Sequence, residues 1–129
     1  MKIILGLLLL TVILIVNTFI RRFSLVKVEG ISMLPTFKDG QVVLMDRKQT
    51  PKEDIVFEFR EDYLGECFII INPISGAHNI KRLTYKERIE GSFKSVYWFE
   101  GDNKEHSYDS RDYGMVSKDY IVGKVVPFS

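Results

Sequence analysis

The chain has little of the chemistry on which most enzymes depend. Its 129 residues include one cysteine, Cys67, and two histidines, His78 and His106. A single cysteine excludes an intramolecular disulfide, and its apolar neighbours in ECFIII predict a buried, unreactive thiol. No group of His, Cys and Asp has the spacing of metal ligands, so we expect neither a metal nor a cofactor. The DSRD segment at 109–112 is interpreted as a charged turn rather than a metal site.

The chain also has no excess of charge of either sign. Lys and Arg total 18 against 17 for Asp and Glu, a formal net charge of +1. This balance gives no overall field that would attract nucleic acid, so we expect no nucleic-acid partner.

Residues 3–20 contain no charge at all. A helix of this length spans about 27 Å, close to the roughly 30 Å hydrocarbon core of a bilayer. Lys2 on one side and Arg21 and Arg22 on the other bracket the run. A cleaved signal peptide would have a shorter apolar region, of about 7–15 residues, and a small-x-small end. We therefore predict an uncleaved membrane anchor over residues 1–22, with the transmembrane helix at about 3–20. By a margin of one charge, the flanking basic residues favour a cytoplasmic domain.

The remaining residues, 23–129, are predicted to form one small β-rich domain. Short runs rich in Val, Ile, Phe and Tyr alternate with turn residues, and no window has a sustained 3.6-residue period. The predicted strands are 24–30, 41–47, 54–59, 66–72, 78–85, 95–100 and 120–126. The fold class is therefore mainly β, a barrel or twisted sandwich attached to a single helix.

The segment GISMLPT at 30–36 holds Ser32 between a glycine and a proline, as either a turn residue or a nucleophile. A nucleophilic serine needs a base within reach. The two histidines lie in polar, loop-like settings, which disfavours a Ser-His-Asp triad. Lys81 in NIKRL is the other candidate, because side chains alternate along a strand and Lys81 can point inward while Arg82 points outward. Burial can lower a lysine pKa by up to about 3–5 units and so produce a neutral base. A lysine on a solvated strand face is the alternative.

Several segments, taken in order, resemble the type I signal peptidases. They are GISMLPT, DGQVVLMDR, DIVFEF, IKR, GDNKEHSYDSRDYGMV and GKVV, and they cover about residues 26–126. The resemblance implies a membrane-bound Ser-Lys serine protease on a β fold, which cuts signal peptides from exported proteins at the outer membrane surface. It also implies, against the charge margin at the anchor, that the domain lies on the extracytoplasmic side.

The resemblance assigns roles to individual residues. Ser32 would be the nucleophile, with its backbone N–H as an oxyanion donor, and Lys81 the general base. Ser107 would hydrogen-bond and orient the lysine amine, and Arg82 would pair with an aspartate. Four further residues would hold the walls of the site in shape: Asp102, Asp109, Ser110 and Arg111.

The expected partners are signal peptides of exported preproteins and the lipid bilayer, and the expected state is a monomer. The sequence departs from the family pattern at Gly30, where some members carry a hydroxyl side chain as a second oxyanion donor. It departs again after Lys81-Arg82, where LTYKERIEG stands in place of an apolar stretch. Two alternatives stay open: a dedicated peptidase with one or few substrates, and a non-catalytic membrane-tethered module that binds exported chains.

Overall fold

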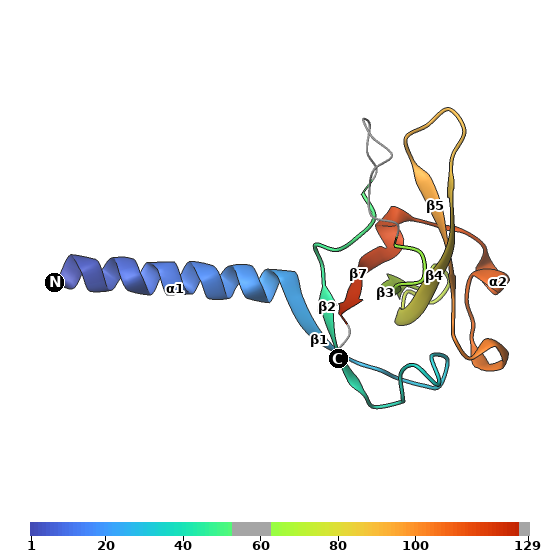
Figure 1. Cartoon of the computed structure of the whole chain (residues 1–129), viewed down its shortest axis with the longest axis horizontal. Coiled ribbons are helices and arrows are strands. Elements are labelled where there is room, and N and C mark those ends of the chain that lie inside the picture. The colour runs from blue at the N-terminus through green and yellow to red at the C-terminus, as the bar shows by residue number, and fades with distance from the viewer. Residues whose placement is uncertain (53–62, 127–129) are drawn as a thin grey trace.

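A computed structural model gives the structure of the chain and describes residues 1–52 and 63–126 (Figure 1). The strand expected at 54–59 lies outside these residues. The helices are α1 Lys2–Arg22, η1 Lys104–His106, α2 Ser110–Tyr113 and η2 Lys118–Tyr120. The strands are β1 Phe23–Lys27, β2 Val42–Asp46, β3 Cys67–Ile71, β4 His78–Arg88, β5 Ser95–Glu100, β6 Val116–Ser117 and β7 Ile121–Val126.

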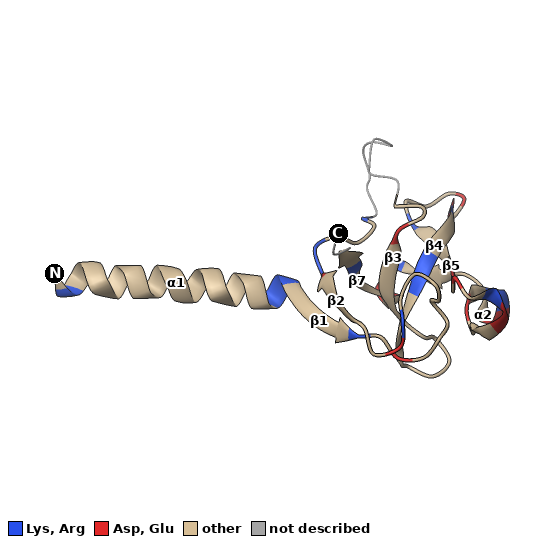
Figure 2. Cartoon of the chain, turned by 60° about the horizontal axis from the view of Figure 1, so that its bottom comes forward, with Lys and Arg blue, Asp and Glu red and all other residues tan. Residues whose placement is uncertain are grey.

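The first helix stands apart from the rest of the chain (Figure 1). α1 has 21 residues, none of them buried, and it is long and apolar enough to cross a membrane. Basic residues mark its two ends (Figure 2). The predicted apolar helix is therefore confirmed, with bounds one or two residues wider than the uncharged run.

The described strands form one seven-stranded sheet in the order β1-β2-β7-β3-β4-β5-β6, with every neighbouring pair antiparallel. This arrangement confirms the prediction of a mainly β domain. Each predicted strand within the described residues is present, although β4 runs three residues further than expected, to Arg88. The two-residue strand β6 was not predicted, because two residues give no alternation pattern to read.

A turn of α-helix, α2, forms at 110–113, where the sequence analysis expects a charged turn. The side chain of Asp109 caps its N-terminus, and the side chain of Asp112 accepts a hydrogen bond from the Asp109 backbone N–H. This reciprocal capping satisfies backbone donors that an isolated turn would leave free. A four-residue helix is too short for hydrophobic periodicity, so only the D-x-x-D spacing could have indicated it.

Buried side chains form two clusters. The first contains Met33, Ile69 and Ile80, among others, and the second contains Phe68, Leu83 and Phe99, among others. Met33 is 1% exposed, so the residue next to Ser32 is a core residue that holds the turn between β1 and β2 against the sheet.

Phe99 tests how much the second cluster contributes. Its ring is fully buried and packs edge-on against Phe68, with the ring centroids 6.0 Å apart. Phe99→Ala is expected to lower the free energy of unfolding of the detergent-solubilised protein by about 3–5 kcal/mol, because it leaves a cavity. Phe93→Ala is the matched control, since that ring is 53% exposed; it should change stability by less than about 0.5 kcal/mol. Equal losses in the two variants would contradict this assignment of the core.

Candidate active site

The fold brings the hydroxyl of Ser32 and the amine of Lys81 into contact. Ser32 lies in the turn between β1 and β2, and Lys81 lies on β4, 49 residues further along the chain. Lys81 Nζ is 2.8 Å from Ser32 Oγ. In the described part of the chain, neither His78 nor His106 is hydrogen-bonded to Ser32. The amine is therefore the base within reach of this hydroxyl.

Strand alternation places Lys81 inside the domain. Ile80 packs in the first cluster and Leu83 in the second, so the two faces of β4 contribute to different clusters. Lys81 shares the face of Leu83 and is 3% exposed. Burial lowers the pKa of Lys81 from its usual value, and the negative charge of Asp109 partly opposes this. The lowered pKa enlarges the neutral fraction, the form that can accept a proton.

The hydroxyl of Ser107 binds Asp109 rather than the lysine. Its Oγ donates to Asp109 Oδ2 over 2.8 Å, and no hydrogen bond joins it to Lys81 within the described residues. The direct Ser107–Lys81 hydrogen bond expected from the sequence is thus not present. Burial would raise the pKa of Asp109, but hydrogen bonds from Arg111, the Gly101 N–H and Ser107 outweigh it and lower the pKa to about 2. Asp109 is therefore a buried carboxylate that stays ionised, and Ser107 donates a hydrogen bond to it.

The other residues around Asp109 fix the loop that follows β5. Asp109 Oδ2 accepts the Gly101 N–H at 2.8 Å, and Asp109 Oδ1 accepts Arg111 Nε–H at 2.9 Å. Ser110 Oγ accepts the backbone N–H of Phe99 at 2.9 Å. These contacts tie α2 to the end of β5. Asp109, Ser110 and Arg111 therefore hold the loop after β5 in place.

Arg82 joins three segments on the outer side of the lysine strand. Its Nε and Nη2 donate to the two oxygens of Asp102 at 2.8 and 2.7 Å, which is the aspartate pairing expected from the sequence. Thr36, four residues after Ser32, also donates to Asp102. This bidentate pair raises the pKa of Arg82 and lowers that of Asp102. These contacts therefore fix the positions of β4, the loop after β5 and the serine turn relative to one another.

Asn103 is a site residue that the sequence reasoning missed. Its backbone N–H donates to the carbonyl of Ser32 at 2.9 Å, and its side-chain amide donates to the carbonyl of Ile31 at 3.0 Å. Asn103 thus holds the peptide groups on both sides of the serine. The GDN motif was the only available signal, because the contact spans 72 residues of sequence.

One donor for an oxyanion is free at the serine. The backbone N–H of Ser32 has no hydrogen-bond partner among the described residues, whereas the N–H of Gly30 donates to Asp39 Oδ1 at 2.8 Å. Gly30 also has no side chain to donate. The geometry therefore offers the Ser32 N–H to a substrate oxygen but supplies no second donor at position 30.

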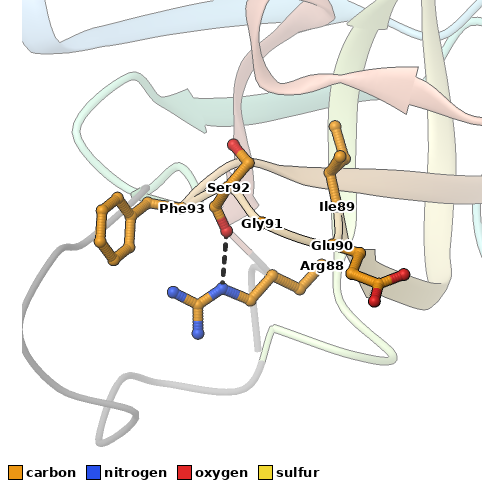
Figure 3. Close-up of a pocket in the computed structure, with 6 residues that line it drawn as sticks. All are labelled: Arg88, Ile89, Glu90, Gly91, Ser92 and Phe93. Atoms are coloured by element: carbon orange, nitrogen blue, oxygen red, sulfur yellow. Dashed lines mark hydrogen bonds between the residues drawn. The ribbon is translucent and has the colours of Figure 1, made fainter.

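A pocket of about 330 Å³ opens beside Ser32. Its walls come from residues 26–29 at the end of β1, from residues 77–80 at the start of β4, and from Met33 and Ile69. A second pocket, of about 540 Å³, lies in the β4–β5 turn at residues 88–93 and contains neither Ser32 nor Lys81 (Figure 3). The pocket at the serine is the one placed for chemistry. The described residues contain no group of three or more His, Cys, Asp and Glu that could hold a metal ion.

The fold and the site define a class of protein: a small β domain on a membrane-length helix, in which a serine hydroxyl meets a buried lysine. Residues 76–129 match the family model described as signal peptidase, peptidase S26. The match supports assigning the chain to the type I signal peptidase family, as the sequence predicts. It includes Lys81 and the loop after β5, and it begins beyond Ser32. No match to the chain is found among curated proteins.

Gly101 tests how tightly the site is packed. A Cβ at this position would overlap the Ser107 side chain and lie 2.7 Å from the carbonyl oxygen of Ser32. Gly101→Ala should destabilise the protein by about 1–3 kcal/mol, measured by denaturant unfolding in detergent. Adding Ser107→Gly removes the side-chain overlap but not the contact with the Ser32 backbone, so the double variant should recover only part of the loss. A Gly101→Ala protein as stable as the wild type would contradict this packing.

Lys81 should be a cost to stability at neutral pH. Its folded pKa lies below the ordinary 10.5, so below pH 10.5 the unfolded chain binds a proton at this position that the folded chain holds less tightly. Lys81→Met removes this penalty, while the half-buried Ser32 can bond water instead of the amine. The melting temperature should rise at pH 7, by roughly 4–8 °C for each kcal/mol gained.

The pH dependence separates this effect from improved packing. The advantage of Lys81→Met should shrink as the pH approaches 10.5, where the unfolded lysine also becomes neutral. Lys94→Met, at an exposed position directly before β5, is the control and should have little effect at either pH. An advantage that is the same at pH 7 and pH 10 would refute the assignment of a buried lysine with a lowered pKa.

Proposed function

We propose that the chain is a membrane-bound serine endopeptidase that cleaves signal peptides from exported preproteins, with Ser32 as nucleophile and Lys81 as general base. The observation that carries the proposal is the 2.8 Å contact between Lys81 Nζ, which is 3% exposed, and Ser32 Oγ. The family match supports a peptidase of the signal peptidase type. The proposed domains are the anchor, residues 1–22, and the catalytic domain, residues 23–129.

The chemistry follows from the two groups in contact. Neutral Lys81 takes the Ser32 proton as Oγ attacks the carbonyl carbon of the scissile peptide bond. The ammonium of Lys81 then gives this proton to the leaving amine, and an acyl-enzyme ester remains on Ser32. A water molecule, deprotonated by the same amine, attacks the ester carbonyl carbon. The bond to Ser32 Oγ then breaks, the ammonium of Lys81 returns the proton to Oγ, and the new C-terminus is released.

The oxyanion formed at each attack needs a donor already in place. The N–H of Ser32, which has no hydrogen-bond partner among residues 1–52 and 63–126, is proposed for this role, because the contacts of Asn103 with Ile31 and Ser32 hold its peptide in position. In serine proteases the loss of one such donor costs about 10²–10³ in rate. A chain with glycine at position 30 is therefore expected to be slower than relatives that place a hydroxyl there.

The substrate is proposed to lie as an extended strand in the pocket beside Ser32. The walls of this pocket are the end of β1, which is an edge strand of the sheet, and the start of β4. An edge strand has unpaired backbone groups to which an extended peptide can bind. Because β1 follows α1 directly, this edge lies at the end of the domain to which α1 is joined (Figure 1). The domain is proposed to lie on the extracytoplasmic side.

The proposal is tested with full-length protein in detergent and a preprotein that carries a small-x-small site. Ser32→Ala and Lys81→Met should each lower kcat/KM by at least about 10³-fold, as loss of a nucleophile or its base does in serine proteases. Lys86→Met controls for the loss of a lysine from the same strand and should cleave normally. Mass spectrometry of the products should locate the cut after a small residue.

The pH profile identifies the base. Activity should rise with pH, because only deprotonated Lys81 accepts the serine proton, and the midpoint should lie below 10.5 because burial lowers the pKa. The rise should be unchanged in His78→Ala and His106→Ala. Full cleavage by the Lys81→Met variant, or a profile that moves when either histidine is replaced, would exclude the Ser-Lys mechanism.

A further inference from the structure

The membrane helix joins the sheet without a linker. α1 ends at Arg22 and β1 begins at Phe23, whose backbone is already extended, with φ −110° and ψ 143°. The N–H of Phe23 still bonds to the carbonyl of Phe19, and the two rings pack with their centroids 5.0 Å apart. The last helical turn and the first strand residue are therefore packed together, and α1 runs directly into β1 (Figure 1).

An ion pair between a partly exposed arginine and a buried aspartate fastens this junction to the second strand. Arg22 Nε and Nη2 donate to the two oxygens of Asp46 at 2.9 and 2.8 Å. Asp46 ends β2, directly opposite Phe23 in the β1–β2 register, and is 1% exposed. The Lys48 N–H and the Gln49 side-chain amide bond the same carboxylate at 3.0 and 2.9 Å. The hydrogen bonds, first of all those of Arg22, lower the pKa of Asp46 to about 2. The carboxylate is therefore ionised over the whole physiological range.

The backbone reinforces the same contact. The Arg47 N–H donates to the carbonyl of Arg22 at 2.8 Å, and the Arg47 side chain reaches the carbonyl of Arg21 at 3.4 Å. These acceptors are helix-end carbonyls that would otherwise need water. The helix end is thus bonded to β2 through both main chain and side chain.

Anchoring alone does not require this arrangement. A short flexible linker would keep the domain at the membrane equally well. An arginine at a helix end ordinarily extends toward the lipid headgroups. Here the guanidinium of Arg22 instead donates to the buried carboxylate of Asp46. Burying a carboxylate is costly unless it is paired. The contact restricts how the domain is oriented on the helix.

We propose that Arg22 and Asp46 are positioning residues that lock the domain on its membrane helix, and so fix the height of Ser32 above the bilayer. The five-residue strand β1 spans about 17 Å at roughly 3.4 Å per residue, and Ser32 follows in a turn whose neighbour Met33 is in the core. Helix, strand and serine turn form one rigid spacer. Its length selects the scissile bond by distance from the membrane-embedded part of the substrate. This selection rests on the proposed function, whereas the lock does not.

The test compares Arg22→Gln with Arg21→Gln in full-length protein reconstituted in bilayers. Both variants remove one positive charge at the same membrane boundary, but in the described residues only the side chain of Arg22 is paired with the domain. The substrates are a series of bilayer-inserted preproteins in which the spacer between apolar helix and small-x-small site grows by one residue at a time. A short soluble peptide with the same site reports the chemistry alone.

The wild type and Arg21→Gln should cleave best at one spacer length. Arg22→Gln should lose roughly 10-fold at this length and gain relative activity at neighbouring lengths, because the scissile bond is no longer held at one height. Its kcat/KM for the soluble peptide should stay within about twofold of wild type, whereas a folding defect would lower both activities. Arg22→Lys, which keeps the charge and one contact, should restore part of the preference. A spacer profile for Arg22→Gln as sharp as that of the wild type would refute the selection by height.

A measurement independent of activity tests the lock itself. Spin labels at Leu8→Cys on α1 and Glu90→Cys in the β4–β5 turn, both exposed, report the distance between helix and domain (Figure 3). Native Cys67 is buried, and burial raises its pKa to about 11, so it should not label. The distance distribution should be narrow in wild type and Arg21→Gln, and broad in Arg22→Gln and Asp46→Asn. Narrow distributions in all four proteins would overturn the lock, even if the wild type cleaved no substrate and the proposed function failed.

Discussion

The whole site depends on keeping one lysine amine away from water. Lys81 is 3% exposed in the middle of a strand, and burial lowers its pKa, while the fixed charge of Asp109 pulls the pKa back up. A deeper position without the carboxylate would give a more neutral but weaker base, whereas an exposed lysine would stay protonated. The opposing effects of burial and of one buried charge set the proton affinity of the amine. Asp109 therefore has two effects: its charge raises the pKa of Lys81, and its hydrogen bonds hold the loop after β5.

Three distant segments have to be held together for this balance to exist. The serine turn, the lysine strand and the loop after β5 meet through Arg82 with Asp102, and through Asn103 with the Ser32 carbonyl. Ion pairs of this kind contribute little net stability where they are partly exposed, but their bidentate geometry is specific. Their main effect is thus to fix the relative positions of the three segments. Hydrophobic burial in the two clusters supplies the stability that this precision requires.

Sequence patterns predicted what depends on local periodicity and missed what depends on long-range contacts. The strands and the inward direction of Lys81 follow from alternation, which two or three neighbouring residues define. The predicted hydrogen-bond partner of Ser107 was wrong. Its hydroxyl donates to the carboxylate of Asp109, and no local sequence pattern reveals that this carboxylate is buried. Asn103 was missed because the acceptor of its side chain lies 72 residues away in the sequence, and α2 was missed because capping rather than periodicity forms it. The sequence analysis predicted that Arg82 pairs with an aspartate, but only the structure shows that this aspartate is Asp102.

Two buried carboxylates serve the molecule in the same way at its two ends. Asp46 at the helix junction and Asp109 near the lysine each accept hydrogen bonds from an arginine and from at least one backbone N–H, and each has a pKa lowered to about 2. The stability that they contribute is complete above the ordinary value of 3.8 and is lost only as the pH falls toward 2. The pKa of Lys81 is lowered, by burial, from an ordinary value of 10.5. Both scaffold charges are constant above pH 3.8, so a change in the protonation of Lys81 above that pH takes place beside fixed charges.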